Sequence, residues 1–325
     1  MAADDNEAMN PALPALPAST APALRGALRL TDWGVIRAQG EDARKFLHGQ
    51  LTQDVEHLQP GTARLAGYCS AKGRLLATFV IWSGSADEVL LACSADLLPT
   101  VLKRLSMFVM RAKCKLSDAS AELPLWGLVG PLAGVDLPTA AWQGSAPGQG
   151  VWLRLPDALA SDGAVSARYL GAGVEPPALP ALDAASWAAL EVQSGVARVV
   201  AATAEQFVPQ MVNLELVGGV SFQKGCYPGQ EIVARSQYRG TLKRRAYAVT
   251  AATDLLPGQE IFHSADAEQP AGMVVLAGRA ADGTPVALVE LKVAALDSGT
   301  LHAGAAGGPL LTLGTLPYAI PAEAA

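Results

Sequence analysis

Residues 224–231 read Lys-Gly-Cys-Tyr-Pro-Gly-Gln-Glu, and local chemistry is more specific in this octet than elsewhere in the sequence. Pro228 suits the first position of a helix, since a backbone N–H would be unpaired there anyway. Gln230 stands three residues after Tyr227, the predicted cap, and can form half of a capping box. The octet therefore predicts a helix that begins at Pro228. The free backbone N–H groups of Gly229 and Gln230 in its first turn would attract anions.

Cys226 precedes this predicted helix start, and Lys224 stands two residues earlier. Both neighbours favour thiolate over thiol, which is the reactive form. Gly225 and Gly229 leave room for a ligand or partner, and Tyr227 offers an aromatic face on which a flat ring could stack. A single cysteine is, however, commonly a small packing residue. The residues alone leave open a reactive or ligand-facing thiol and a packing cysteine.

Three further stretches carry polar groups of interest. Gln210 and Asn213, within 207–215, have amides that could read the edge of a heterocycle. Turn-stabilising hydrogen bonds around Pro209 are an equal alternative. The tip Ala71-Lys72-Gly73-Arg74 is basic, although ordinary surface is the commoner role of such a turn. The basic residues of 235–245 fit solvated surface and anion binding equally well.

The composition limits the class of protein. The chain of 325 residues carries a net charge of −6 with a pI near 5.3, which argues against broad nucleic-acid binding. No apolar run is long enough to predict a membrane span. Residues 1–24 begin with acidic residues and are rich in proline, which is unlike a secretory signal and predicts a disordered tail. We therefore expect a cytoplasmic protein.

The potential metal ligands are scattered along the chain. Four cysteines and four histidines show no C-x-x-C or similar spacing, so we expect neither a stably bound metal nor disulfides. The usual motifs of nucleotide hydrolases, dinucleotide-dependent oxidoreductases, zinc proteases and serine hydrolases are also missing.

Hydrophobic periodicity predicts an α+β chain. Strands and amphipathic helices alternate in the first part in an order typical of a split βαβ, ferredoxin-like unit. The region 123–170 is strand-like, and the proline-rich stretch 175–180 precedes another helix. Short strands separated by turn signals beyond Arg245 predict a small antiparallel barrel. The first elements are predicted as strands at 27–38, 63–69, 75–82, 88–93 and 112–116 and helices at 40–58, 95–109 and 183–196.

The octet resembles the signature of the YgfZ family, which has a mitochondrial relative that assists iron–sulfur assembly. The resemblance extends over about residues 25–320, through the stretches 46–55, 67–74, 207–215 and 235–245 in the expected order. The family shares the fold of the glycine-cleavage T-protein. The resemblance therefore implies two ferredoxin-like α/β units within 25–245, divided near 120–125. A C-terminal antiparallel barrel over 246–320 follows, and the parts surround a central channel.

The resemblance also implies a function. The channel would admit tetrahydrofolate or a one-carbon derivative as cofactor. The family acts in assembly or repair of iron–sulfur clusters, including those of radical enzymes that methylthiolate tRNA. Iron–sulfur client or assembly proteins are thus the expected partners, with no direct contact to nucleic acid or membrane. The family's activity depends on residues matching Cys226 and Lys224. The residues expected to contact folate are Gln210, Asn213, Gly225, Tyr227, Gly229, Gln230, Glu231 and Arg235.

Two alternatives to this function follow from the same fold. A folate-dependent aminomethyltransferase has a hairpin with a Gly-Gly-x-x-Asp-Asp pattern that supplies a catalytic aspartate. The corresponding residues are 73–78 here, where Ala77 and Thr78 replace both acidic residues, so the carboxylate that this chemistry needs is missing. A folate-sensing scaffold without chemistry is the other alternative. The sequence does not predict a classical enzyme.

Overall fold

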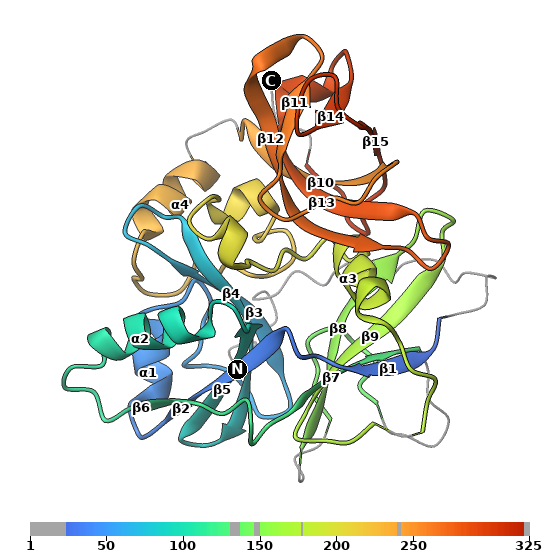
Figure 1. Ribbon diagram of the computed structural model, residues 1–325. Helices are drawn as coiled ribbons and strands as arrows, with labels where there is room; N and C mark the ends of the chain where they lie inside the picture. Colours follow the sequence, from blue (N-terminus) through green and yellow to red (C-terminus); the bar gives the residue numbers. More distant parts are fainter. Residues whose placement is uncertain (1–23, 131–136, 146–149, 177, 239–241, 322–325) are drawn as a thin grey trace, which may run out of the picture.

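Three β-sheets surround the middle of the molecule (Figure 1). The structure is a computed structural model that describes residues 24–130, 137–145, 150–176, 178–238 and 242–321. The predicted disordered tail therefore lies outside the described residues, apart from Leu24. No helix within the described ranges is long and apolar enough to cross a membrane.

The first sheet is antiparallel, has the strand order β3-β4-β5-β2-β6, and packs against two helices. Its central strands are buried along almost their whole length, because the helices cover one face and the rest of the protein covers the other. The elements are β2 (Trp33–Gln39), α1 (Ala43–His48), β3 (Ala63–Cys69), β4 (Leu75–Ser85), β5 (Glu88–Ser94), α2 (Leu98–Phe108) and β6 (Lys115–Asp118).

The single strand predicted over 27–38 is wrong, because the chain forms two strands there that belong to different sheets. β1 (Gly26–Arg29) pairs with β7 of the second sheet, whereas β2 pairs with β5 and β6 of the first. Asp32 lies in the connection, and its carbonyl accepts a hydrogen bond from Ala95 N at 2.9 Å. Apolar alternation runs through both strands, so periodicity alone could not locate the change of sheet.

The helix predicted over 40–58 is also too long. The five apolar residues predicted for its inner face are buried, but α1 ends at His48. Beyond it, the Thr52 hydroxyl donates to Gly219 O at 2.6 Å and accepts from Gly67 N at 2.7 Å. The Gln53 amide donates to Gly218 O at 2.6 Å. These long-range hydrogen bonds take the place of helical ones and hold residues 218–219, which precede the octet, against β3.

The second sheet has the order β1-β7-β9-β8 and is followed by α3 (Ala184–Gln193). The Asp183 carboxylate accepts from Ser186 N at 2.7 Å and so caps α3. One side of α3 packs on β8 and the other on β12 and β13 of the third sheet. A β-carbon on Gly278 of β12 would lie only 2.8 Å from Ala189 Cα, so strand and helix meet backbone to backbone. The remaining strands of this sheet are β7 (Leu125–Val129), β8 (Val151–Leu159) and β9 (Val165–Ala172).

The third sheet is a closed antiparallel barrel, as predicted, with the order β10-β13-β12-β11-β14-β15. Closure removes the unpaired edges that an open sheet would expose. Residues 201–212, which contain η2 (Ala201–Thr203) and η3 (Pro209–Val212), and α4 (Gln230–Tyr238) connect the second sheet to the barrel. The barrel consists of β10 (Arg244–Ala251), β11 (Glu260–His263), β12 (Asp266–Arg279), β13 (Pro285–Lys292), η4 (Val293–Leu296), β14 (Leu301–Ala303) and β15 (Leu310–Leu313).

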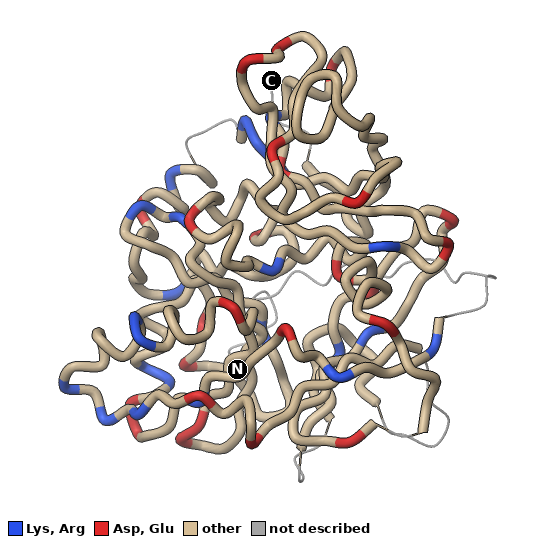
Figure 2. Tube along the Cα trace, in the orientation of Figure 1, with Lys and Arg blue, Asp and Glu red and all other residues tan. Residues whose placement is uncertain are grey.

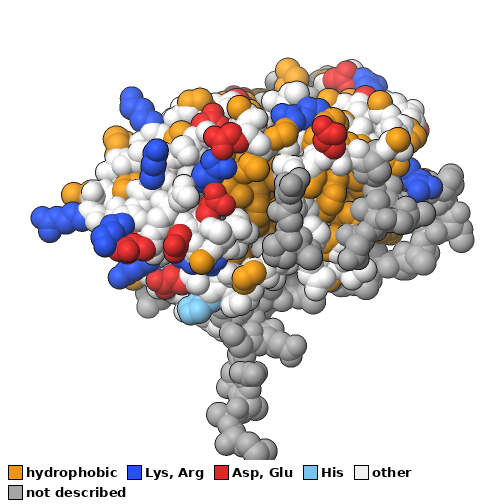
Figure 3. Space-filling view, turned by 90° about the horizontal axis from the view of Figure 1, so that it is seen from below, with side chains coloured by type: hydrophobic (Ala, Val, Ile, Leu, Met, Phe, Trp, Pro, Cys, Tyr) orange, Lys and Arg blue, Asp and Glu red, His pale blue; other side chains and the backbone are white. Residues whose placement is uncertain are grey.

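Charge and apolar surface are unevenly distributed. Figure 2 shows many of the Lys and Arg residues on the side of the molecule that holds α2 and α4. Residues 97–117 illustrate this, because they contain Lys and Arg but no Asp or Glu. Seen from below, hydrophobic side chains lie along the underside of the molecule (Figure 3). A pocket between the first and second sheets is lined by Trp82, Leu90 and Leu153, among others.

Candidate functional site

The octet forms a tight turn followed by a helix. Gln230 N donates to Tyr227 O at 3.2 Å, and Gly229 adopts a φ of +79°. Proline at the second and glycine with positive φ at the third position are the features of a type II turn. The predicted helix start at Pro228 is therefore wrong, since α4 begins at Gln230. Proline's fixed φ suits both a turn and a helix start, which explains the error.

This turn packs tightly against the β3–β4 hairpin. A β-carbon on Gly229 would lie 2.6 Å from both Cα and N of Gly73, and closer still to Ser70 O. A β-carbon on Gly73 would lie 2.8 Å from Ile232 Cβ in α4. The octet and the hairpin tip are far apart in the sequence, and two glycines allow their backbones to touch. The hairpin tip is therefore part of the site's framework rather than unattached surface.

Lys224 anchors the octet to the end of α1. Its Nζ donates to Leu51 O at 2.8 Å and to His48 O. The same Nζ lies 4.8 Å from the centre of the Tyr227 ring. Burial lowers the pKa of Lys224 to about 8, although the negative charges of Asp54, Cys226 and Glu56 oppose this shift. The ammonium is therefore held by backbone carbonyls and an aromatic face rather than by a direct ion pair.

Cys226 differs from the other cysteines in its exposure. Cys69 and Cys93 are buried and Cys114 is half-buried, whereas Cys226 is exposed. Burial raises the pKa of the Cys69 and Cys93 thiols to about 12, and that of Cys114 to about 11. Of the two interpretations of Cys226, its exposure fits the ligand-facing thiol and does not fit the packing cysteine.

Several of the other residues that the sequence predicts to contact folate are buried or paired within the protein. Tyr227 is buried, burial raises the pKa of its hydroxyl, and Lys224 occupies one face of its ring. A β-carbon on Gly225 would lie 3.7 Å from His48 Nε2. In α4, Arg235 pairs with Glu231 at 3.2 Å on the exposed surface, and Gln230 is partly exposed.

Gln210 and Asn213 are fully buried and bind other parts of the protein. The Gln210 amide donates to Val233 O at 2.8 Å, which connects η3 to α4. Asn213 has a φ of +56°, and its amide donates to Ala246 O at 2.8 Å and to the Tyr318 hydroxyl at 3.3 Å. Both amides are therefore engaged within the protein, but with distant elements rather than with the turn around Pro209 that the sequence suggested as the alternative. Their predicted contact with folate stays a prediction.

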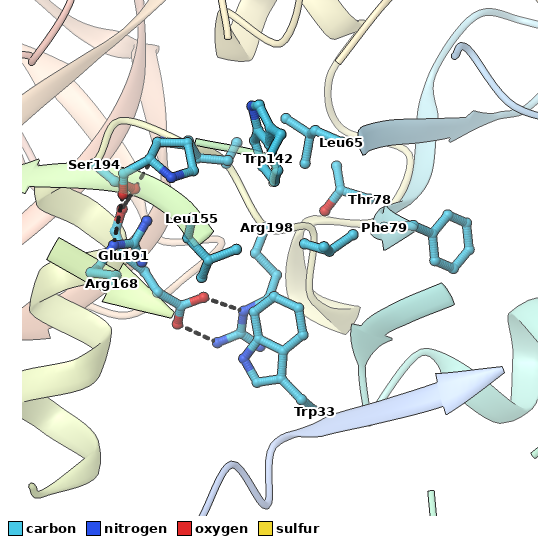
Figure 4. A pocket seen from close by; sticks show the side chains of 14 residues that line it. Trp33, Leu65, Thr78, Phe79, Trp142, Leu155, Arg168, Glu191, Ser194 and Arg198 are labelled. Carbon is cyan, nitrogen blue, oxygen red and sulfur yellow. Dashed lines mark hydrogen bonds and ion pairs between the residues drawn. The ribbon is translucent and has the colours of Figure 1, made fainter. Parts of the chain in front are cut away.

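A cavity lies between the first sheet, the second sheet and α3 (Figure 4). Its wall includes Trp33 of β2, Thr78 of β4, Arg168 of β9, Glu191 of α3 and Arg198. No octet residue lines it, nor do Gln210, Asn213 or Arg235. Apart from Thr78, these residues were not among those singled out from the sequence. The available signal was the presence of charged residues inside a strand and a helix that are otherwise apolar.

Arg198 organises one side of the cavity. It makes two hydrogen bonds of 2.9 Å to the Glu191 carboxylate, and others to Asp32 at 2.8 Å and Ser94 Oγ at 3.1 Å. Its guanidinium also lies 4.8 Å from the Trp33 ring. Burial lowers the pKa of Arg198, but the two carboxylates outweigh burial and raise it above the usual value. Arg198 therefore stays charged and joins β2, β5 and α3.

Arg168 and Thr78 give the cavity further polar groups. Arg168 Nε donates to Pro156 O at 3.1 Å, and its guanidinium carbon lies 5.7 Å from the Trp187 ring. Burial lowers the pKa of Arg168 to about 10. The Thr78 hydroxyl accepts from Val199 N at 3.0 Å. Among the described residues, Trp33 Nε1 has no hydrogen-bond partner, so it can donate to a ligand.

Comparison with known proteins places the chain in a family. No protein-family model matches the sequence. The "tRNA-modifying protein YgfZ" of Edwardsiella ictaluri is 31% identical over 304 residues, which cover 90% of this chain and 92% of that protein. The protein of the same name from Colwellia psychrerythraea is 30% identical over 318 residues, covering 91% and 94%. The chain belongs to the YgfZ family. The predicted family is thereby confirmed.

A solved structure confirms the predicted fold of this YgfZ-family chain. The glycine cleavage system aminomethyltransferase T from Bartonella henselae superposes with a TM-score of 0.62, covering 91% of this chain and 87% of that one. The two sequences are 16% identical, so the likeness concerns the fold alone. The fold is α+β and T-protein-like, with the closed C-terminal barrel described above.

Proposed function

We propose that this chain binds tetrahydrofolate or a one-carbon derivative and acts in the assembly or repair of iron–sulfur clusters. Through these clusters it would support enzymes that modify tRNA, in the cytoplasm. The single observation that carries the proposal is the exposed Cys226 thiol, fixed between the Lys224 anchor and the Gly229–Gly73 contact. Membership of the YgfZ family supports the connection to tRNA modification, because the relatives carry that name.

Cys226 would act as a thiolate toward a cluster, a persulfide or a partner protein. An exposed thiol on a firmly held segment can meet a partner surface, whereas a buried one cannot. Lys224 supports the thiolate electrostatically while its ammonium is charged, which is its main form at pH 7 because its pKa is about 8. The chemistry thus needs an iron–sulfur client or assembly protein, and no direct contact with nucleic acid.

The folate would lie in the central cavity. A pterin is flat and presents hydrogen-bond donors and acceptors along its edge, which suits a wall of Trp33, Thr78 and Arg168. We therefore assign pterin recognition to these cavity residues rather than to the residues named from the sequence, none of which lines the cavity.

Aminomethyl transfer is the weaker proposal for the same fold. Thr78 and Ala77 occupy the positions of the acidic pair, and neither carries a carboxylate. The Thr78 hydroxyl is also engaged with Val199 N. Detection of methylene transfer from a glycine-derived aminomethyl group to tetrahydrofolate would nevertheless overturn our proposal in favour of this enzyme.

Two experiments test the proposed function. In a strain that lacks its own family member, Cys226→Ala should fail to restore iron–sulfur enzyme activity and methylthiolated tRNA. Cys114→Ala, which removes a half-buried thiol, should restore both. Full restoration by Cys226→Ala would refute the thiol mechanism. Separately, calorimetry should detect binding of tetrahydrofolate or its 5-formyl derivative. If no heat of binding is detected at high micromolar ligand, folate binding is refuted, and a scaffold without chemistry becomes the better interpretation.

A further inference from the structure

A histidine–carboxylate pair lies directly beside the octet. The Asp54 carboxylate is almost completely buried, with its side chain 4% exposed. His48 Nδ1 lies 3.0 Å from Oδ1 of Asp54, and His57 Nδ1 lies 2.9 Å from Oδ2. Because α1 ends at His48, the following loop brings Asp54 back to this imidazole. The sequence spacing of six residues did not predict this contact.

The carboxylate fixes the tautomer of His48. Burial raises the pKa of Asp54, but hydrogen bonds from the backbone and ring of His57, with the charges of His57 and Arg64, outweigh burial and lower it. An ionised carboxylate only accepts hydrogen bonds, so its contacts with the two rings favour a proton on Nδ1 of each imidazole. Glu56 N also approaches His48 Nδ1, but at 3.5 Å this contact is longer than the 3.0 Å contact with Asp54, which we take to decide the tautomer. Nε2 of a neutral His48 therefore carries a free lone pair.

That lone pair faces the octet. A β-carbon on Gly225 would lie 3.7 Å from His48 Nε2, in ordinary van der Waals contact, so the glycine leaves this nitrogen uncovered. Cys226 is the next residue, and consecutive Cα atoms are about 3.8 Å apart. The His48 side chain is 14% exposed, and Lys224 also binds the His48 carbonyl. His48 therefore binds a carboxylate through one nitrogen and lies with the other next to the residue that precedes the thiol. An imidazole held by a carboxylate that can reach a nucleophile in this way is the arrangement that activates nucleophiles in enzymes.

We propose that His48 accepts the proton of the Cys226 thiol and that Asp54 is a positioning residue for this imidazole. The inference rests on the proposed role of Cys226 and deepens it. When Cys226 attacks an electrophile, its Sγ–H proton passes to His48 Nε2, the sulfur forms the new bond, and the leaving group departs with its electron pair. The imidazolium, stabilised by Asp54, then releases the proton to solvent.

Alkylation of the folded protein by iodoacetamide tests the proposal. In this reaction, Cys226 Sγ bonds to carbon, iodide leaves, and mass spectrometry of the Cys226 peptide gives the rate. The charged or titratable groups around His48 are Asp54, Glu56, His57, Arg64, Lys224 and Cys226. All except the altered residue remain in each variant, so their titration is common to the curves being compared.

We expect His48→Gln to lower the rate at pH 7 about tenfold and to match the unaltered chain above pH 10. The two curves should meet there because the thiol ionises without a base at high pH. His302→Gln is the matched control, since it removes an imidazole of β14 in the barrel, where its partners are Thr300 and Gly308. Its loss should change the rate less than twofold. Asp54→Asn, which keeps the imidazole but not its orientation, should behave like His48→Gln.

An unchanged rate in His48→Gln overturns the proposal. So does a rate lowered by the same factor at every pH, because that result means altered access rather than proton transfer. Circular dichroism shows whether each variant is folded. If His48→Gln does not fold, the pH dependence of Asp54→Asn tests the proposal in its place. These outcomes leave the complementation result for Cys226→Ala unaffected. Failure of the proton-transfer inference is therefore distinguishable from failure of the proposed function.

Discussion

Replacing Gly229 by alanine should break the contact between the octet and the β3–β4 hairpin. The added β-carbon would lie 2.6 Å from two backbone atoms of Gly73, where ordinary contact begins near 3.4 Å. The backbones must therefore separate by at least about 0.8 Å. Neither neighbour is a flexible side chain that could turn away, so the whole hairpin tip or the turn has to move.

The expected loss of stability has two parts. A left-handed backbone costs a residue with a β-carbon about 1–2 kcal/mol, and overpacking costs about 1–3 kcal/mol. We therefore expect Gly229→Ala to lower the free energy of unfolding by about 2–5 kcal/mol. Gly283→Ala is the matched control, because Gly283 has a similar φ of +86° but no atom within 4 Å of its added β-carbon. Gly283→Ala should lose only the stability that corresponds to the left-handed backbone, and none from overpacking.

Urea unfolding followed by circular dichroism measures both variants. The difference between them isolates the packing contribution, since the conformational cost is common to both. Gly229→Ala should also change the alkylation rate of Cys226, whereas Gly283→Ala should not. If the two variants lost the same stability, within about 0.5 kcal/mol, the tight contact between turn and hairpin would be refuted.

Two further perturbations follow from buried charges. The pKa of Lys224 is about 8 in the folded protein, below its usual value of 10.5. Between these pH values the Lys224 amine is mostly protonated in the unfolded chain and mostly neutral in the folded protein. The contribution of Lys224 to the free energy of unfolding therefore rises with pH in this range. Lys224→Met should remove that rise, and urea midpoints at pH 7.5 and 9.5 that change equally in both proteins would contradict it. Arg198→Met should lower the free energy of unfolding by about 3–5 kcal/mol, because two carboxylates lose their partner. Arg279→Met, which breaks the exposed pair with Asp254, should lower it by less than about 1 kcal/mol, and equal losses would contradict the role given to Arg198.

The octet and the matching stretches around it were sufficient to predict the family and the fold, but not the conformation of the octet. Pro228 and Gly229 fit a helix start and a type II turn equally well, and the hairpin packed against Gly229 selects the turn. The buried apolar residues of 40–58 were likewise predicted correctly. The Thr52 hydroxyl nevertheless donates to Gly219 and accepts from Gly67, and these hydrogen bonds to distant residues end the helix early. Local sequence patterns contain no information about such partners.

The cluster of charged residues around Arg198 could not be predicted from the sequence for a related reason. Arg198 binds Asp32 in the connection between β1 and β2, Ser94 in β5 and Glu191 in α3. No spacing along the chain predicts these contacts. Gln210 and Asn213 show the opposite case. Their amides looked suited to a ligand, but the fold uses them to join η3 to α4 and to β10. An amide has the same hydrogen-bonding groups in either role.

The close contact of α3 with the barrel restricts how a ligand can reach the central cavity. Gly278 and Ala189 meet with no side chain between them, and α3 also packs on β8. A rotation of the barrel against the second sheet would require the backbones of α3 and β12 to move past each other, and their direct contact leaves no room for this movement. Domain rotation, a common way to open a buried site, is therefore blocked on this side. We therefore expect the proposed ligand of the cavity to enter through rearrangement of side chains such as Trp33, which lines it, so its exchange rate should depend on rotamer changes rather than on the movement of whole domains.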